Sequence, residues 1–359
     1  KADHFKPMAM QKRQNNLIST ASDVLFYHNV TRTIKNRYLP KMSEDCLYLN
    51  VWKPAGDKKN LPVVFYIHGG SLTTGQSWWQ DYNGESYAKK DVIFVTFSYR
   101  LGALGFYADE NLARESSNNT TGMYGFLDQV KALEWVNKNI KSFGGDPNKI
   151  TIAGESAGSS SVNAMCVSPL TKGLFRYAIS ESSSITGKKP PHSYKDFADA
   201  IKQGKTLRDE LGVSSPVDLR KVSAEKIANT STKYGTLNAM TNDGYALKKS
   251  PYESYLAGEH NEKALLTGYN KKDGDLFMLV DKKTNKDTYK ESIKAIYPRA
   301  YREIIKAYPA NSDEEAENNQ RKIYNAATFG YGHDVWSRLA VKDEPVYRYY
   351  FTKENKSIG

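Results

Sequence analysis

The chain has 359 residues, of which 39% are hydrophobic and 25% are charged. This composition is typical of a globular protein with a large buried core, folded as one large α/β domain or as two smaller ones. The formal net charge is +11, but the lysines are widely spread and accompany no recognised nucleic-acid motif. We therefore interpret them as a solvated surface rather than a nucleic-acid interface. No apolar run approaches the ~20 residues that a membrane helix needs.

The two cysteines, Cys46 and Cys166, are too few for a disulfide framework, and neither has the spacing of a metal ligand set. Cys166 is expected to act as a small buried hydrophobe. The cysteine content leaves both oxidising and reducing compartments open.

The first half of the chain predicts strands and one long helix. Residues 43–52 alternate apolar and polar side chains like a strand, and 62–67 and 92–97 are continuous apolar runs typical of buried strands. Residues 125–142 place apolar side chains at helical spacing. A further β-branched run, 150–153, follows at once. This strand–helix–strand order predicts a parallel sheet.

The second half continues the sheet with longer insertions. Strands are expected at 177–180, 264–268 and 346–351. Between the first two, about 195–247 is helical, polar and interrupted, which is typical of a cap inserted into a sheet domain. Helices are expected after the turn at 270–274 and through about residue 339.

The most informative motif is Gly-Glu-Ser-Ala-Gly at 154–158. A strand followed by Gly-x-Ser-x-Gly and small residues is the pattern of a nucleophile elbow, in which a sharp turn holds the serine at its apex. The two glycines remove bulk that would collide with the neighbouring strand or helix. Ser156 is therefore the predicted nucleophile.

A nucleophilic serine needs amide donors for the oxyanion, and these must lie on a loop beside the elbow. The segment His-Gly-Gly-Ser at 68–71 has the form that α/β-hydrolases place after an early strand. The predicted oxyanion hole consists of the backbone amides of Gly70, Ser71 and Ala157.

The triad acid should follow the serine in the chain and lie beyond the end of a strand. Asp273 fits this position, and Asp275 is close enough to compete. Only one histidine, His333, follows Asp273 in the sequence. Its surroundings are helical, whereas a triad histidine usually lies on a loop, so a packing or surface role is favoured for His333.

These motifs together resemble the type B carboxylesterases of the cholinesterase/carboxylesterase family. Residues 43–51 match the family's second signature, and 154–158 lie within its first. Tyr-Arg-Leu-Gly at 99–102 and Phe-Gly-Gly-Asp-Pro at 143–147 are further landmarks. The similarity runs from about residue 10 to the end of the chain.

The resemblance implies roles for individual residues. The oxyanion loop maps onto 68–71, and the triad acid maps onto Asp273, where most members carry glutamate. Ser182 resembles a serine that supports the acid and the nucleophile. Glu155 and His68, which adjoin the elbow and the oxyanion loop, are expected to support the same site.

The resemblance also implies that the chain is incomplete at both ends. The family's N-terminal strands would precede Lys1, and its triad histidine would follow Gly359. The chain by itself is therefore expected to be inactive. In secreted animal members Cys46 pairs with a cysteine further upstream, whereas in bacterial members it is typically unpaired.

The sequence thus predicts an α/β-hydrolase: a mostly parallel, twisted sheet flanked by helices, one domain over 1–359 with a helical cap at 187–262. We expect a serine hydrolase that cleaves carboxylic esters, on small molecules or on polysaccharides, through an acyl-enzyme on Ser156. No metal, organic cofactor, nucleic acid or membrane span is expected, and compartment and oligomeric state are left open. The alternative is a non-catalytic, cholinesterase-like adhesion or binding domain, although such members commonly lose the elbow serine. The pocket wall is expected to include aromatic side chains, with Trp78, Trp79 and Tyr124 as hypotheses.

Overall fold

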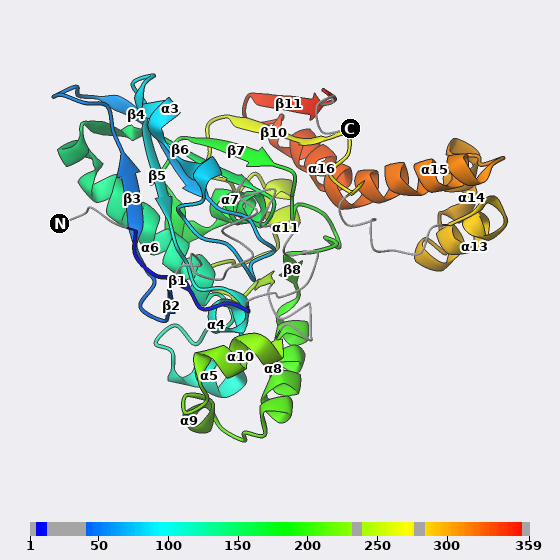
Figure 1. Ribbon diagram of the computed structural model, residues 1–359, viewed down its shortest axis with the longest axis horizontal. Coiled ribbons are helices and arrows are strands. Elements are labelled where there is room, and N and C mark those ends of the chain that lie inside the picture. Colours follow the sequence, from blue (N-terminus) through cyan, green and yellow to red (C-terminus); the bar gives the residue numbers. More distant parts are fainter. Residues whose placement is uncertain (1–4, 13–40, 232–238, 276–283, 354–359) are drawn as a thin grey trace.

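The computed structural model describes residues 5–12, 41–231, 239–275 and 284–353. A seven-stranded sheet flanked by helices forms its centre (Figure 1). The strands lie in the order β11-β10-β7-β6-β4-β5-β3. Their bounds are β3 (Leu49–Trp52), β4 (Leu61–Ile67), β5 (Ile93–Phe97), β6 (Gly145–Glu155), β7 (Tyr177–Glu181), β10 (Leu265–Asn270) and β11 (Val346–Phe351). Neighbouring strands are parallel except β3, which is antiparallel to β5. The predicted mostly parallel sheet is confirmed.

The strand at 43–52 is shorter than predicted. Residues 44–48 form local turns instead of a ladder, since the amides of Cys46 and Tyr48 donate to carbonyls two residues back. The side chain of Ser43 accepts from the Asp45 amide in the same way. These local bonds compete with strand pairing, so the ladder begins only at Leu49.

The helices beside the sheet bury apolar faces against it. α6 (Tyr124–Asn139) and α7 (Ala157–Val167) are the longest of these, and residues 157–166 of α7 are all buried. The shorter elements are α3 (Glu85–Ala88), α4 (Gly102–Phe106), α5 (Glu110–Glu115), α11 (Pro251–Leu256) and the 3-10 turns Gln80–Tyr82, Ile140–Phe143 and Pro169–Thr171. The expected burial of Cys166 is confirmed, since none of its surface is exposed.

A helical lobe projects from one end of the sheet (Figure 1). It contains α8 (Phe197–Leu211), α9 (Pro216–Leu219) and α10 (Ala224–Ser231), packed with α4 and α5. A separate hydrophobic cluster of Ala103, Tyr107, Leu207, Leu211 and Ile227 holds it together. Two short parallel pairs complete the strands, β8 (Tyr194–Lys195) with β9 (Met240–Thr241) and β1 (Met8–Ala9) with β2 (Met42–Ser43). The bounds 187–262 for a cap stay a prediction.

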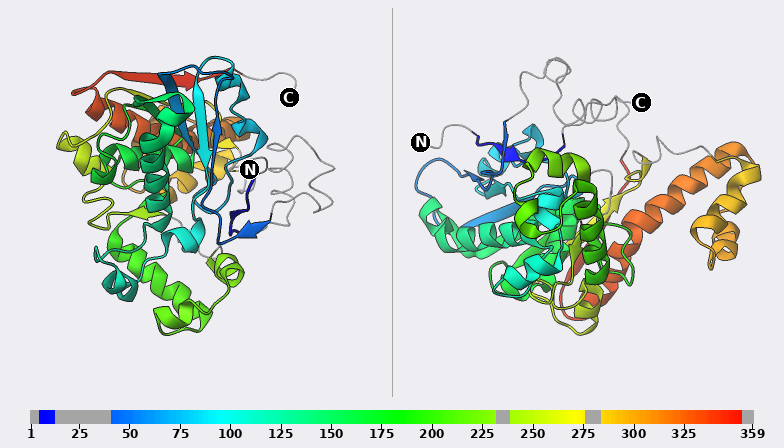
Figure 2. Two further views of the ribbon diagram at one scale, coloured as in Figure 1. Left: turned by 90° about the vertical axis from the view of Figure 1, so that its left-hand side faces the viewer. Right: turned by 90° about the horizontal axis from the view of Figure 1, so that it is seen from below.

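A second projection was not foreseen in the sequence. α13 (Lys286–Ile296), α14 (Tyr301–Ala307) and α15 (Asp313–Asn325) extend away from the sheet as an arm (Figures 1 and 2). Buried side chains of Tyr289, Ile293, Ala316 and Ile323 form its own hydrophobic cluster. A π-helical turn, Ala326–Gly330, continues α15 directly into α16 (Tyr331–Ala340), which packs on β10.

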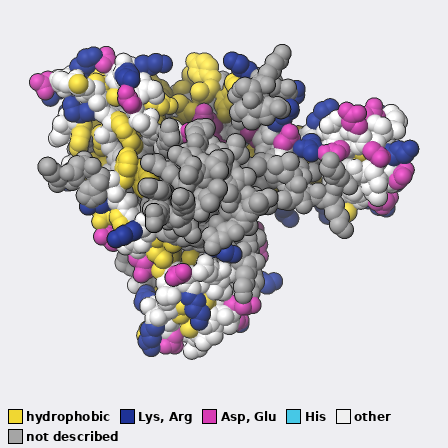
Figure 3. Space-filling model, viewed as in Figure 1, with side chains coloured by type: hydrophobic (Ala, Val, Ile, Leu, Met, Phe, Trp, Pro, Cys, Tyr) yellow, Lys and Arg dark blue, Asp and Glu magenta, His cyan; other side chains and the backbone are white. Residues whose placement is uncertain are grey.

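On the face of the molecule that Figure 3 shows, charged side chains of both signs are interspersed rather than gathered into one basic patch. In the part of the chain that the structure describes, no helix is both long enough and apolar enough to span a membrane.

Candidate active site

Ser156 lies in a sharp turn between β6 and α7. Its backbone has φ 55° and ψ −125°, a conformation that costs a residue with a side chain of order 1–3 kcal/mol. A Cβ on Gly158 would lie 2.0 Å from the Ile67 carbonyl oxygen, and one on Gly154 would lie 2.5 Å from the Gly158 carbonyl carbon. Only glycine fits at either position, which is the steric reason given for the motif.

The 68–71 loop follows β4 and lies against this turn. A Cβ on Gly69 would be 3.1 Å from the Ser156 Cβ, so the two backbones are in direct contact. The Gly70 carbonyl accepts from the amides of Thr73 and Thr74, each at 3.0 Å. Gly70 itself has φ 99° and Ser71 has φ 56°. The loop is therefore a tight turn fixed by its own hydrogen bonds.

The first amides of α7 follow Ser156 directly in the chain. The amide of Ser160 is the first that donates back along the helix, to the Ser156 carbonyl at 3.1 Å. The amide of Ala157 lies before it, at the helix terminus that carries partial positive charge. Ser71, Ser156 and Ala157 line one cavity of about 300 Å³. The structure thus brings together three of the predicted site residues, while Gly70 lies beside the cavity, next to Ser71.

The other walls of this cavity come from the segment that leads into β8, from α8 of the lobe, from the residue before β9 and from the helix that leaves the arm. They consist of Pro191, His192, Ser193, Tyr194, Lys195, Gln203, Ala239, Tyr324, Thr328 and Phe329. The aromatic residues suggested for the pocket wall pack elsewhere. Trp78 stacks on Phe5, Trp79 packs on Tyr82, and the Tyr124 ring lies beneath Arg100.

Two backbone hydrogen bonds connect the strands that lie between Ser156 and Asp273. The Ser156 amide donates to the Glu181 carbonyl on β7, and the Ser182 amide donates to the Gly268 carbonyl on β10, both at 2.8 Å. Ser182 is buried with φ 58°. It thus lies between the nucleophile's strand and the strand that carries the predicted acid.

Asp273 lies just beyond the carboxyl end of β10. Its two carboxylate oxygens accept from the Asn270 amide at 2.7 Å and from the Asn270 side chain at 2.8 Å. Asp275, the competing candidate, lies 3.9 Å from Arg321 of α15 instead. The Asp273 carboxylate is therefore the one held at the sheet edge on which Ser156 also lies.

Glu155 is electrostatically coupled to this edge. The residue as a whole is exposed, whereas its carboxyl is crowded by neighbouring protein atoms. Desolvation, together with the charges of Asp273 and Glu181, raises the pKa of Glu155 to about 7. The carboxyl is therefore part-protonated near neutral pH, and the three acidic groups do not all carry full charge at once.

His68 is a structural residue of the loop. It is buried, it stacks on Tyr99 with ring centroids 4.4 Å apart, and its Nδ1 lies 2.8 Å from the Gly69 carbonyl. Burial lowers the pKa of His68 to about 4. A neutral ring locked in this position supports the loop and does not face the cavity lining.

His333 is a packing residue. It is fully buried on α16, with Nδ1 2.5 Å from the Thr267 hydroxyl of β10 and its ring stacked on Tyr269. Burial, with smaller effects of Arg348 and His192, lowers the pKa of His333 to about 3. The packing role favoured from the sequence agrees with this geometry.

His192 is the histidine that sequence reasoning missed. It lines the cavity with Ser156, its Nδ1 lies 3.2 Å from the Ser193 hydroxyl, and its buried Nε2 has no hydrogen-bond partner among the described residues. Burial lowers its pKa. The neighbouring Lys195 donates to Gln203, and burial lowers the pKa of Lys195 to about 8. Both lie in a region without periodicity, so no sequence signal placed them beside Ser156.

Comparison with known proteins gives a consistent result. The model of the carboxylesterase family matches residues 1–358. The chain is 33% identical over 316 residues to fumonisin B1 esterase of Sphingopyxis macrogoltabida, covering 86% of this chain and 58% of that protein. It is 36% identical over 248 residues to para-nitrobenzyl esterase of Bacillus subtilis, covering 68% and 50%.

Solved structures agree with the fold. A carboxylesterase of Geobacillus stearothermophilus superposes with a TM-score of 0.77 at 31% identity, covering 88% of this chain and 67% of that one. The alignments thus span 58% and 50% of the length of these two curated relatives.

Proposed function

Because the chain belongs to the carboxylesterase family, we propose that the protein hydrolyses carboxylic esters with Ser156 as the nucleophile. One observation carries this proposal: Ser156 is held at a strained turn and lines a cavity together with Ser71 and Ala157. The neighbouring amides are the donors that an oxyanion above the serine would require.

The proposed mechanism has two steps. The Ser156 Oγ attacks the ester carbonyl and gives up its proton to a base, and the tetrahedral oxyanion accepts from the amides of Ser71 and Ala157, with that of Gly70 beside them. The alcohol leaves with that proton, and an acyl-enzyme remains. Water then attacks by the same route and releases the acid. Each oxyanion donor contributes about 3–4 kcal/mol to lowering the barrier.

The acid of the proposed triad is Asp273. Its carboxylate is held by Asn270 at the sheet edge beyond β10, where it would orient the base and stabilise its charged form. Glu155, Ser182 and His68 act through this frame. They fix the elbow, the β7–β10 junction and the oxyanion loop respectively.

The base is proposed to be a histidine outside the described residues. His68, His260 and His333 are absent from the cavity lining, and His192 lines it from the segment before β8 without a carboxylate partner among the described contacts. If none of the chain's histidines, His4 and His28 included, supplies this base, the 359-residue chain should hydrolyse p-nitrophenyl esters at a residual rate, roughly 10⁴-fold or more below an intact triad.

Chemical rescue tests this proposal. Free imidazole added to the 359-residue chain should then raise p-nitrophenyl acetate turnover, because a soluble base can take the proton of Ser156. Ser156→Ala should abolish the rescue, and Ser193→Ala, which removes another hydroxyl from the same cavity, should retain it. Robust turnover without imidazole that is lost in His192→Gln or His333→Gln would place the base within this chain instead.

A covalent label separates an esterase from a binding domain. A fluorophosphonate should attach to Ser156 of the whole protein, as peptide mapping by mass spectrometry would show. A whole protein that is folded but neither labelled nor active would favour the alternative, a non-catalytic binding domain. The relatives' names mention structurally diverse esters, so we propose an ester on a small molecule or a polysaccharide, with a group small enough for the 300 Å³ cavity.

A further inference from the structure

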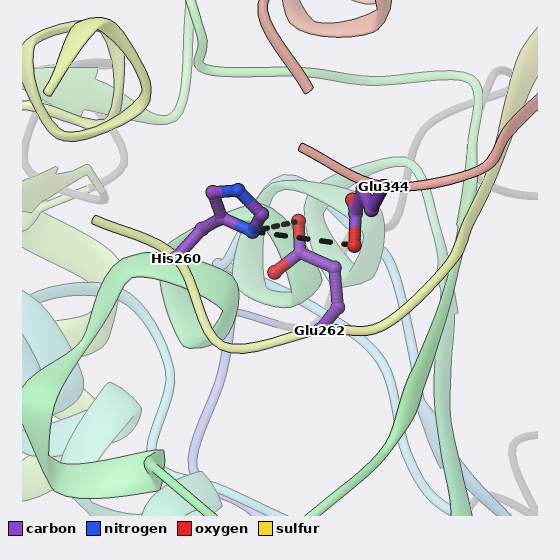
Figure 4. Close-up of side chains that lie close together, drawn as sticks. All are labelled: His260, Glu262 and Glu344. Carbon is purple, nitrogen blue, oxygen red and sulfur yellow. Dashed lines mark ion pairs between the residues drawn. The ribbon is translucent and has the colours of Figure 1, made fainter. Parts of the chain in front are cut away.

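A second cluster of ionisable side chains lies at the opposite edge of the sheet from Ser156. His260 and Glu262 precede β10, and Glu344 precedes β11. These three side chains point toward one another in Figure 4. Because β6, β7, β10 and β11 run parallel, their amino ends lie far from the carboxyl ends where the proposed active site is built. The cluster is therefore independent of the proposed ester chemistry.

The cluster is buried and incompletely paired. The side chains of His260, Glu262 and Glu344 are 8%, 0% and 3% exposed. Neither carboxylate oxygen of Glu344 has a hydrogen-bond partner among the described residues, and neither does Nδ1 of His260. Burying a carboxylate with no hydrogen bond and only His260 at 4.0 Å is costly, so Glu344 calls for a ligand.

The separations are those of groups that share a cation. The His260 Nδ1 lies 3.7 Å from a Glu262 oxygen and 4.0 Å from a Glu344 oxygen, and one donor atom from each residue falls within 4.8 Å of the others. Metal bonds of about 2.0–2.2 Å place tetrahedral ligands roughly 3.4 Å apart. Side-chain rotations that bring the donor atoms up to about 1.5 Å closer together would place all three around one ion.

The surrounding contacts are those expected around a metal site. The second ring nitrogen of His260, Nε2, faces the Asp343 carboxylate at 3.6 Å, as in sites where a carboxylate orients a ligating histidine. The Tyr255 hydroxyl and the Asn261 amide donate to Glu262. The Tyr255 ring also stacks on His260 at 5.2 Å. Asp343 is half exposed, which leaves a route from solvent.

We propose that His260, Glu262 and Glu344 bind one divalent transition-metal ion of the zinc or manganese class, with Asp343 orienting the histidine. The imidazole nitrogen selects against magnesium and calcium, which prefer oxygen ligands. The ion would tie the loop before β10 to the loop before the edge strand β11. Its role would be structural.

The test is thermal unfolding and calorimetry on the whole 359-residue chain, stripped with a chelator and free of affinity tags. Zn²⁺ or Mn²⁺ should bind with one-to-one stoichiometry. At 100 times the Kd, the Tm should rise by roughly 4 °C. Mg²⁺ at the same concentration should leave the Tm unchanged.

Four variants sharpen the result. His260→Gln and Glu344→Gln should lose the metal-dependent rise in Tm. Asp343→Asn should weaken binding by about 10- to 100-fold without abolishing it. Glu259→Gln changes a neighbouring carboxylate that is exposed and paired with Lys249, and it should bind like the parent chain.

Two outcomes would overturn the proposal. One is a parent chain whose Tm and metal content do not respond to Zn²⁺ or Mn²⁺. In that case the two glutamates share a proton, and Glu344→Gln should be at least as stable as the parent. The other is unchanged binding in both His260→Gln and Glu344→Gln, which would move the ion to another site. If one ligand variant fails to fold, metal binding by the other ligand variant and by Asp343→Asn still tests the site.

Discussion

Among single residues, Glu155 gives the site a pH-dependent contribution to stability. Its pKa is raised from about 4.5 to about 7 in the folded chain. Below pH 4.5 both folded and unfolded chains hold the proton. As pH rises from 4.5 to 7, the unfolded chain loses this proton before the folded chain does. The free energy of unfolding therefore decreases over that window. Glu155→Gln should remove this decrease in the free energy of unfolding, because glutamine does not titrate.

The measurement is the Tm of the variant minus that of the parent at several pH values. The difference should be smallest near pH 4 and should increase to a plateau above pH 7, with the variant the more stable. Glu225→Gln replaces an exposed glutamate on α10 and should show no such trend. A difference that is flat with pH would mean that Glu155 is not held in a desolvating site.

How far single site residues are predictable depends on whether their neighbours are local in sequence. Ser156 and Ala157 are set by one motif and Ser71 by another, and the structure brings all three to one cavity. Asp273 followed from its place after a strand. His192 and Lys195 come from a stretch with no motif, and only the fold carries them to Ser156.

At the scale of elements, β4 and α7 pack so closely at the elbow that only glycine fits at position 158. A methyl group on Gly158 would lie 2.0 Å from the Ile67 carbonyl oxygen, so β4 and α7 would have to separate. Gly158→Ala should cost more than about 3 kcal/mol of unfolding free energy and remove fluorophosphonate labelling of the whole protein.

Gly173→Ala is the matched control for this change. Gly173 has φ 80° and nothing within 4 Å of an added Cβ, so the substitution should cost only about 1 kcal/mol through its backbone conformation. Urea unfolding of both variants checks the difference. Equal costs would show that the elbow tolerates a wider turn than the contact distances imply.

A buried ion pair joins α8 of the lobe to the loop after α4. Arg208 lies 2.6 Å from Asp109, whose side chain is 5% exposed. Tyr107 and the Asn111 amide also donate to this carboxylate. Arg208→Leu should leave the charge only partly compensated and cost about 3 kcal/mol.

The exposed pair Lys205–Asp209 on the same helix provides the comparison. Lys205→Leu should change the unfolding free energy by less than about 1 kcal/mol. Hydrogen exchange over residues 197–231 should report both variants. Equal protection in both would mean that the lobe is held by its apolar cluster alone.

The strands were predictable because central parallel strands are buried on both faces and read as continuous apolar runs. β5, for example, is buried at all five positions. The failure at 43–52 has the opposite cause. Alternation there is interrupted by local side-chain and backbone bonds, which no periodicity reveals.

In the whole molecule, the arm is a separate unit of packing. Ile293 is buried among arm residues rather than against the sheet. Ile293→Ala should therefore cost about 2–5 kcal/mol locally and reduce hydrogen-exchange protection over 286–325, while β4 and β6 remain protected.

Ile152→Ala, in the main core on β6, should instead lower protection throughout the sheet. Loss of sheet protection in Ile293→Ala would show that the arm and the sheet unfold together. The arm could not be predicted because amphipathic helices reveal which face is buried, but not against which partner.

One uninterrupted rod of helix runs from the arm through the π-helical turn into α16. Tyr324, Thr328 and Phe329, which line the cavity together with Ser156, all lie in the middle of this helix. A contact that moves the far end of the arm would therefore also move these three residues of the cavity lining. The size of the group that fits beside Ser156 should therefore depend both on these three lining residues and on the hydrophobic cluster of the arm, which lies away from the cavity.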